Sequence, residues 1–113
     1  SKGGFDPSKP GYYYVLKIEN VQGEVILYKG GITNQFEKRL AQHQQRFGLE
    51  KRSQNWKLSL EELVEFKIGQ EARELETKLL QIEEIRAPNI DNVSSELFME
   101  NPLQYARNLG LIS

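Results

Sequence analysis

The chain has 113 residues, of which 38% are hydrophobic, and its formal net charge is −1. This length and apolar content predict one domain with one hydrophobic core. The sequence has no cysteine and one histidine, which excludes disulfide frameworks, cysteine nucleophiles and zinc sites rich in cysteine or histidine. Its apolar runs are only a few residues long, so we expect no membrane span and an intracellular protein of the cytoplasm or nucleus.

The net charge argues weakly against nucleic-acid binding, which normally requires a surplus of Lys and Arg. The charges are nevertheless segregated along the chain. Basic side chains in the first half include Lys29, Lys38, Arg39, Arg46, Lys51, Arg52 and Lys57, and the next stretch contains Glu61, Glu62, Glu65, Glu71, Glu74, Glu76, Glu83 and Glu84. One basic face and one acidic face would explain this order, although ordinary solvated surface explains it more simply from charge alone.

Residues 1–10 carry two prolines, two glycines and little apolar content, which predicts a flexible lead-in before a single domain at 11–113. Residues 11–18 and 24–29 are rich in aromatic and β-branched side chains and predict two strands. The spacer at 20–23 has the Asn and Gly of a tight connection. These features predict an antiparallel hairpin that begins near Gly11 and ends near Gly31.

Residues 30–33 are expected to end the second strand. Asn34 followed by Glu37 has the spacing of a helix N-cap with an acidic third residue, which predicts a helix from Gln35 to Gly48. Arg39 and His43 of this helix are four residues apart, so their side chains can reach one common point. Its apolar stripe is formed by Phe36, Leu40 and Phe47.

The second half predicts a loop at 49–57, with Trp56 against the core, a third strand at 63–68 and a helix at 70–85. Glu76 lies beside the apolar stripe of that helix, at the edge of its buried face. Residues 95–99 predict a short strand or an extended segment, and Asn101 with the following proline predicts a last helix to about residue 108. We therefore expect an α/β (α+β) fold with a central three-stranded antiparallel sheet flanked by helices.

This order of motifs resembles the GIY-YIG nuclease superfamily. Residues 11–13 (GYY) match the Gly-Ile-Tyr motif, and residues 29–31 (KGG) lie over the second, Tyr-Ile-Gly motif, so that Lys29 replaces its tyrosine. Residues 28–33 (YKGGIT) are similar to a branch of the superfamily that reads Tyr-Lys-Xaa-Gly-Ile-Thr. An alternative register places residues 28–30 over the second motif and keeps the tyrosine, but it needs one extra residue before Arg39.

The two helices extend this resemblance over roughly residues 11–92. Residues 37–43 (EKRLAQH) are similar to the family's Lys-Arg-Leu-Xaa-Xaa-His helix, and residues 72–76 (ARELE) to its Ala-Xaa-Xaa-Leu-Glu helix. Asn89 loosely matches a downstream asparagine of the family. The resemblance implies an endonuclease that hydrolyses DNA phosphodiester bonds with a divalent metal ion, Mg²⁺ or Mn²⁺.

The resemblance also implies roles for individual residues. Glu76 would hold the metal, since a hard cation takes oxygen ligands and keeps several waters. Arg39 would grip the scissile phosphate with its planar guanidinium. Tyr13 would act as general base or position the water, which requires cations such as Lys29 and Arg39 to favour its phenolate. His43 would orient Tyr13 or relay its proton.

Several points stay open at the level of the sequence. Because three tyrosines follow one another, a shift of one residue would exchange Tyr13 for Tyr14 at the site. The basic residues that we expect to contact DNA phosphates are Arg46, Lys51, Arg52 and Lys57. A separate targeting domain or partner protein is compatible with so short a nuclease. The alternatives are a catalytically silent module of the same fold, which binds nucleic acid or protein, and an unrelated α+β interaction domain.

Overall fold

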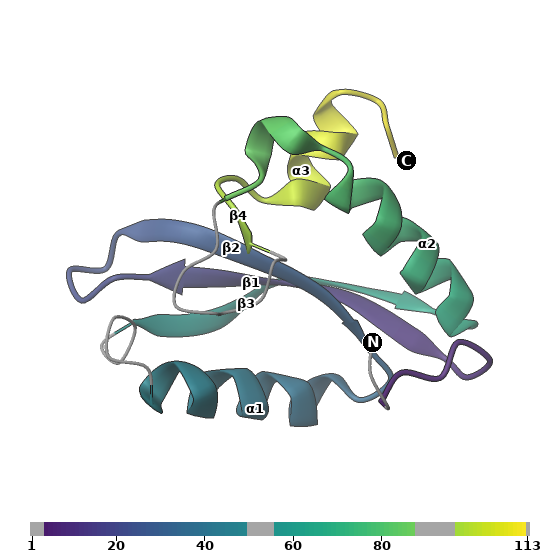
Figure 1. Ribbon diagram of the computed structural model, residues 1–113, viewed down its shortest axis with the longest axis horizontal. Helices are drawn as coiled ribbons and strands as arrows, with labels where there is room; N and C mark the ends of the chain where they lie inside the picture. The colour runs from purple at the N-terminus through teal and green to yellow at the C-terminus, as the bar shows by residue number, and fades with distance from the viewer. Residues whose placement is uncertain (1–3, 50–55, 88–96, 113) are drawn as a thin grey trace.

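The computed structural model describes residues 4–49, 56–87 and 97–112. This part of the chain forms an α+β fold in which a four-stranded antiparallel sheet lies between helices (Figure 1). The elements in chain order are β1 (Gly11–Glu19), β2 (Val25–Thr33), α1 (Phe36–Leu49), β3 (Lys57–Phe66), α2 (Gly69–Leu80), the short 3₁₀ helix η1 (Glu83–Ile85), β4 (Leu97–Phe98) and α3 (Pro102–Asn108).

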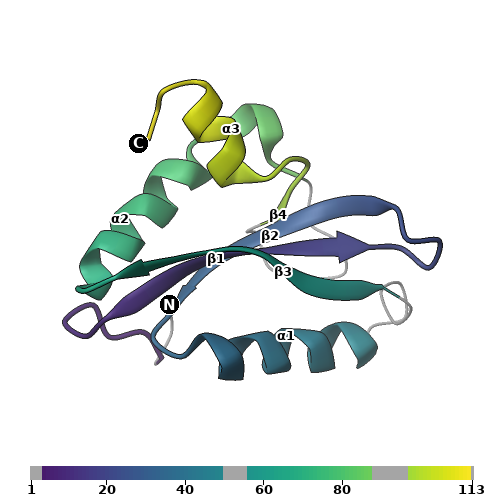
Figure 2. The same ribbon diagram turned by 180° about the vertical axis from the view of Figure 1, so that it is seen from behind.

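The strand order is β3-β1-β2-β4, so β1 is central and makes both long pairings. Helix α1 lies along one face of the sheet, whereas α2 and α3 cover the other face, as the two opposite views show (Figures 1 and 2). Alternate side chains of β1 therefore enter two different layers. Tyr13 and Val15 join the cluster under α2 and α3, and Tyr14, Leu16 and Ile18 join the cluster over α1.

The prediction of three strands was wrong, because β4 adds a fourth at the outer edge of β2. Leu97 and Phe98 pair with Lys29 and Tyr28, and both are almost fully buried. A two-residue strand has no alternation that a sequence pattern can reveal, and tertiary packing decides whether it forms. It covers only the middle of β2, so within the described residues the segment from Gly30 to Thr33 has no strand on its outer side.

The predicted hairpin is confirmed. Its connection is held by the Asn20 side chain, which accepts hydrogen bonds from the backbone N–H groups of Gln22 at 2.9 Å and Glu24 at 3.0 Å, while Gly23 adopts a φ of 83°. The strand end predicted at residues 30–33 was wrong. Strand β2 continues through both glycines to Thr33, which pairs with Tyr12.

Helix α1 begins one residue later than predicted, and its cap differs. The Oγ1 atom of Thr33 accepts a hydrogen bond from the backbone N–H of Gln35 at 3.0 Å. The Asn34 side chain points to the start of the chain instead: it accepts from the backbone N–H of Asp6 at 2.7 Å and donates to the carbonyls of Asp6 at 3.0 Å and Pro10 at 2.8 Å.

The expectation of a flexible lead-in at 1–10 was wrong for residues 4–10, which we call the N-terminal strap. Phe5 is buried, and it packs against Gly69 at the start of α2. The carbonyl of Lys9 accepts from the Gly69 N–H at 2.6 Å, and that of Pro7 from the Gln70 N–H at 2.9 Å. The strap thus joins the start of α2 to Asn34 on the other side of the sheet, and it is held by buried Phe5 together with hydrogen bonds at both ends.

The remaining boundaries differ in a consistent direction. Each boundary lies earlier in the sequence than predicted. Strand β3 begins at Lys57 rather than at residue 63. The helix predicted at 70–85 ends at Leu80, and η1 follows from Glu83. The last helix is confirmed: the Asn101 side chain accepts from the N–H groups of Leu103 and Gln104, with Pro102 in the first turn. No helix within the described residues is long and apolar enough to cross a membrane.

Candidate active site

Two neighbouring tyrosines of β1 point to opposite faces of the sheet. Tyr13 has an exposed fraction of 1% and packs in the cluster with Ala72 and Leu79 of α2, whereas Tyr14 is 3% exposed and packs in the cluster with Phe36 and Leu40 of α1. The register of the sequence motif therefore decides which face carries a tyrosine-dependent site.

Both tyrosine rings cross over β2 where that strand has glycine. A Cβ atom on Gly30 would collide with the Tyr13 hydroxyl, and one on Gly31 would collide with the Tyr14 hydroxyl, with the Tyr14 Cζ only 2.6 Å away. The glycine pair leaves room for one hydroxyl on each face. The sequence suggested that Gly30 and Gly31 break the strand. Instead, both lie within β2 and leave room for the two rings.

On the α1 face, the Tyr14 hydroxyl and His43 Nε2 form a hydrogen bond of 2.8 Å across 29 residues of sequence. The two rings lie 5.8 Å apart and are inclined by 48°. His43 was expected to contact Tyr13, and the structure brings it to Tyr14 instead. A buried phenol bonded to a half-buried imidazole can pass its proton to the imidazole nitrogen.

Lys29 belongs to the same face, because it pairs with Leu16 and Leu97, which are both in the α1-side cluster. It has an exposed fraction of 3%, which is unusual for lysine. The side chain of Lys29 is therefore buried on the face that holds Tyr14 and His43.

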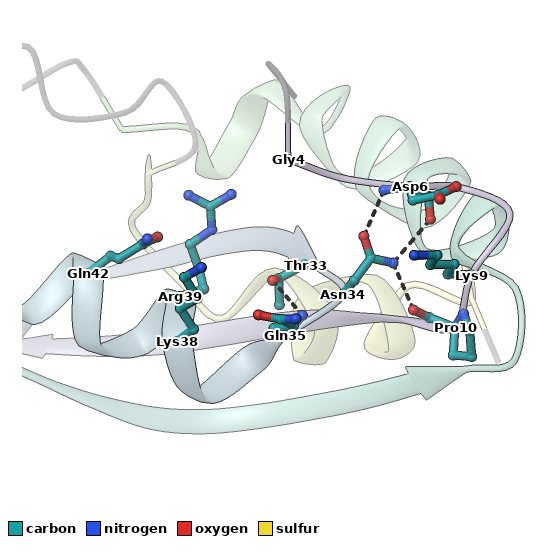
Figure 3. A pocket seen from close by; sticks show the side chains of 10 residues that line it. All are labelled: Gly4, Asp6, Lys9, Pro10, Thr33, Asn34, Gln35, Lys38, Arg39 and Gln42. Atoms are coloured by element: carbon teal, nitrogen blue, oxygen red, sulfur yellow. Dashed lines mark hydrogen bonds between the residues drawn. The ribbon is translucent and has the colours of Figure 1, made fainter.

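Arg39 lies one helical turn before His43, at the start of α1, and it lines a pocket of about 580 Å³ between the helix, the end of β2 and the N-terminal strap. Arg39 stands up from the helix on one side of the pocket, with Gly4 and Asp6 on the other (Figure 3). Of β2, the pocket is lined by Thr33, the last residue of the strand.

Glu76 lies on α2 and is half-buried, so it comes from the side of the sheet that holds Tyr13. The structure thus groups Tyr14, Lys29 and His43 on the α1 face and places Glu76 across the sheet from them. No group of three or more His, Cys, Asp or Glu side chains that could hold a metal occurs within the described residues. One carboxylate still fits a hard cation such as Mg²⁺, which completes its shell with waters and substrate phosphate oxygens.

Most of the basic residues predicted to contact DNA lie outside the described part of the structure. This applies to Lys51 and Arg52 and to the side chain of Arg46. Asn89, the loose match to a family asparagine, also lies outside the described residues. Lys57 is exposed and pairs with Glu19, while Thr33 at the pocket pairs with Tyr12. The seven steps from residue 12 to residue 19 span roughly 23 Å of strand, so Lys57 lies at the far end of the sheet from the pocket.

The sequence reasoning missed two basic residues of the pocket. Lys9 was assigned to the flexible lead-in, and Lys38 was noted in a basic run and in the helix motif without a role at the site, although both line the pocket beside Arg39. Lys38 could have been found from its place next to Arg39 in the helix. Lys9 gave no signal, because its place depends on the contact between Asn34 and the strap.

Comparisons with protein-family models, with curated protein sequences and with solved structures found no match for this chain. The geometry of the site therefore supplies the argument for function.

Proposed function

We propose that the chain is an endonuclease of the GIY-YIG type that hydrolyses DNA phosphodiester bonds with a divalent metal ion. The observation that carries the proposal is the 2.8 Å hydrogen bond between the Tyr14 hydroxyl and His43, one helical turn from Arg39 in a basic pocket. Phosphodiester hydrolysis needs an activated water, a cation on the phosphoryl oxygens and help for the leaving oxygen. These residue types can meet the first two needs.

In this proposal, Tyr14 rather than Tyr13 positions or deprotonates the attacking water. His43 accepts the proton of the Tyr14 hydroxyl, and Lys29, buried on the same face, supplies positive charge that favours a phenolate. Arg39 holds the phosphate, because a guanidinium can bond two phosphoryl oxygens and keeps its charge. The metal held by Glu76 would stabilise negative charge on the phosphoryl and leaving oxygens.

The Gly30–Thr33 end of β2, which β4 does not pair with in the described part of the chain, is the edge where the two faces can act on one substrate. Arg39 lines the pocket beside this edge from the α1 side, and α2 packs against β1 and β2 from the other side. A phosphodiester bound at the edge would lie between groups of both layers. This arrangement supports a role for Glu76 together with Arg39, although the two residues belong to opposite layers.

The placement of Glu76 and Arg39 in opposite layers also favours a second function. If Glu76 does not reach the phosphate, the pocket would still bind a nucleic-acid backbone, and the chain would be a silent binding module of this fold. Substitution of the second motif tyrosine by Lys29 points the same way. Metal-dependent cleavage distinguishes the two functions.

The test is nicking of supercoiled plasmid at low salt with Mg²⁺ or Mn²⁺, comparing wild type with Arg39→Ala and Glu76→Ala. We expect each variant to reduce the rate by about 10²-fold or more, the usual effect of removing a group that stabilises transition-state charge. Glu74→Ala is the matched control, because Glu74 is an exposed glutamate of the same helix, two residues away, and it should cleave like wild type.

Wild-type protein that is folded by circular dichroism but nicks no DNA with either metal would contradict the nuclease proposal. Cleavage that persists in Glu76→Ala would remove the metal role of Glu76 and leave the α1 face as the site of chemistry.

A further inference from the structure

The pocket that contains Arg39 carries more positive charge than the proposed hydrolysis uses. Its lining includes Lys9, Lys38 and Arg39, and the only carboxylate among its lining residues is that of Asp6. The chain as a whole has a net charge of −1, so this concentration of cations is local. A pocket lined by cations and amides suits an anionic ligand that also offers hydrogen-bond acceptors.

Asp6 is already engaged by its own turn. Its Oδ1 atom accepts hydrogen bonds from the Ser8 hydroxyl at 2.6 Å and the Ser8 N–H at 2.9 Å. The side-chain bond from Ser8, followed by the backbone bond, holds the pKa of Asp6 below its ordinary value of 3.8. The carboxylate is therefore charged at neutral pH, and the pocket keeps a surplus of two positive charges, three cations against one carboxylate.

The wall that carries Lys9 is fixed to the rest of the pocket. Asn34 makes three hydrogen bonds to the strap, to Asp6 and Pro10, and the carbonyl of Lys9 itself accepts from the N–H of Gly69. Figure 3 shows these Asn34 bonds between the helix side of the pocket and the strap. Fixed walls reduce the entropy that a ligand loses on binding.

The size of the pocket indicates the class of ligand. A volume of about 580 Å³ lies in the range of sites that hold ligands of roughly 300–1,000 Å³, and a single phosphate would leave much of it empty. Gln35 and Gln42 add amide groups to the lining. The positive end of the α1 dipole adds to the attraction for phosphate.

We propose that this pocket binds the sugar–phosphate backbone of the DNA next to the scissile phosphate, and that Lys9 and Lys38 contact backbone phosphates there. The inference rests on the proposed function, because it takes Arg39 to hold the scissile phosphate. Phosphate contacts of this kind fix the position of a strand without reading its sequence. The strap therefore belongs to the DNA-binding surface, although its sequence reads as a linker.

The experiment measures binding of a fluorescently labelled DNA duplex in EDTA, so that no cleavage occurs, over a series of salt concentrations. The variants are Lys9→Gln and Lys38→Gln, and the matched control is Lys78→Gln, an exposed lysine of α2 outside the pocket. We expect each pocket variant to weaken binding at low salt and to reduce the slope of log K against log salt by about 0.9, the value for one lost phosphate contact. The control should match wild type.

Slopes for Lys9→Gln and Lys38→Gln equal to that of Lys78→Gln would overturn the inference, and so would the absence of duplex binding by folded wild type at low salt. Failure of the nuclease proposal looks different. Reduced slopes in both pocket variants, combined with no metal-dependent nicking by wild type, would leave the binding pocket in place and remove only the catalysis.

Discussion

The two faces of the sheet are built from the same strands but hold their tyrosines in different surroundings. Under α2 and α3, Tyr13 packs among residues that are almost all apolar and fully buried, including Phe98 and Leu103. Over α1, Tyr14 packs in a smaller apolar cluster with Leu16 and Ile18, and its hydroxyl bonds to the half-buried His43. One residue of register thus separates a tyrosine in the larger cluster from a tyrosine that contacts a histidine.

This difference teaches where chemistry can be placed on a small sheet. A large buried layer supplies stability, because removing apolar surface from water is the main favourable term in folding. The opposite layer is then able to hold costly groups such as Lys29, together with a titratable imidazole. Among the proposed site residues Glu76 is the exception, because it lies on α2, in the layer that forms the larger core.

The largest expected effect comes from removing one tyrosine hydroxyl at a time. We expect Tyr14→Phe to lower the rate of metal-dependent nicking by about 10²-fold or more, the range for loss of a general acid–base group, and Tyr13→Phe to remain within a few-fold of wild type. The ring NMR signals of His43 should shift in Tyr14→Phe and not in Tyr13→Phe, because Tyr14→Phe removes the bond to His43.

The reverse result would exchange the roles of the faces. Cleavage lost in Tyr13→Phe and kept in Tyr14→Phe would place the reaction beside Glu76 on the α2 side and restore the tyrosine that the sequence motif favours.

A smaller effect is expected from adding a methyl group at Gly30 or at Gly31. Gly30→Ala and Gly31→Ala should each lower the free energy of unfolding by about 1–3 kcal/mol, as overpacking usually does. Gly30→Ala should lower the free energy of unfolding more than Gly31→Ala, because its Cβ would also lie 3.2 Å from Phe98 Cε2. Tyr13 and Phe98 are almost fully buried, so neither ring can move into solvent. Urea denaturation measures both values.

The same pair of variants separates the faces spectroscopically. Gly31→Ala pushes the Tyr14 ring and should shift the His43 resonances, whereas Gly30→Ala should leave them unchanged. Unchanged His43 signals in a folded Gly31→Ala variant would show that the Tyr14–His43 bond does not depend on the glycine.

Much of this fold can be predicted from the sequence where the signal is local. The turn at Asn20 and the cap at Asn101 are each determined by a few neighbouring residues, and both predictions are confirmed. The predictions fail where distant contacts decide. Strand β4 exists because residues 97 and 98 meet the edge of β2, and Asn34 leaves the helix cap because the strap offers it three hydrogen bonds.

The candidate site shows the same division. Arg39 and His43 follow from helical spacing, since side chains four residues apart lie on one line. Which tyrosine meets His43 depends on the strand register, which three consecutive tyrosines leave undetermined in the sequence. The place of Lys9 in the pocket depends on the strap, which Asn34 holds through Pro10 across 24 residues of sequence, and no local pattern records that contact.

The smallest expected effect concerns the strap that ties the two faces together. The pKa of Asp6 is held below 3.8 by the hydrogen bonds from Ser8, with the charge of Lys9 as a weaker cause. A group with a lowered folded pKa stabilises the folded state above its unfolded pKa, and this contribution is lost as pH falls through the folded pKa. Acidification below about pH 4 should therefore loosen the strap.

The readout is the pair of backbone amide signals of Gly69 and Gln70, whose N–H groups donate to the strap carbonyls of Lys9 and Pro7. In wild type these signals should move as the pH falls below about 4, because the lowered pKa of Asp6 puts its protonation below the ordinary range of aspartate, whereas in Asp6→Asn they should stay constant. Identical titration in wild type and Asp6→Asn would assign the change to another group. The charge of Asp6 would then contribute nothing to the attachment of the strap to α2.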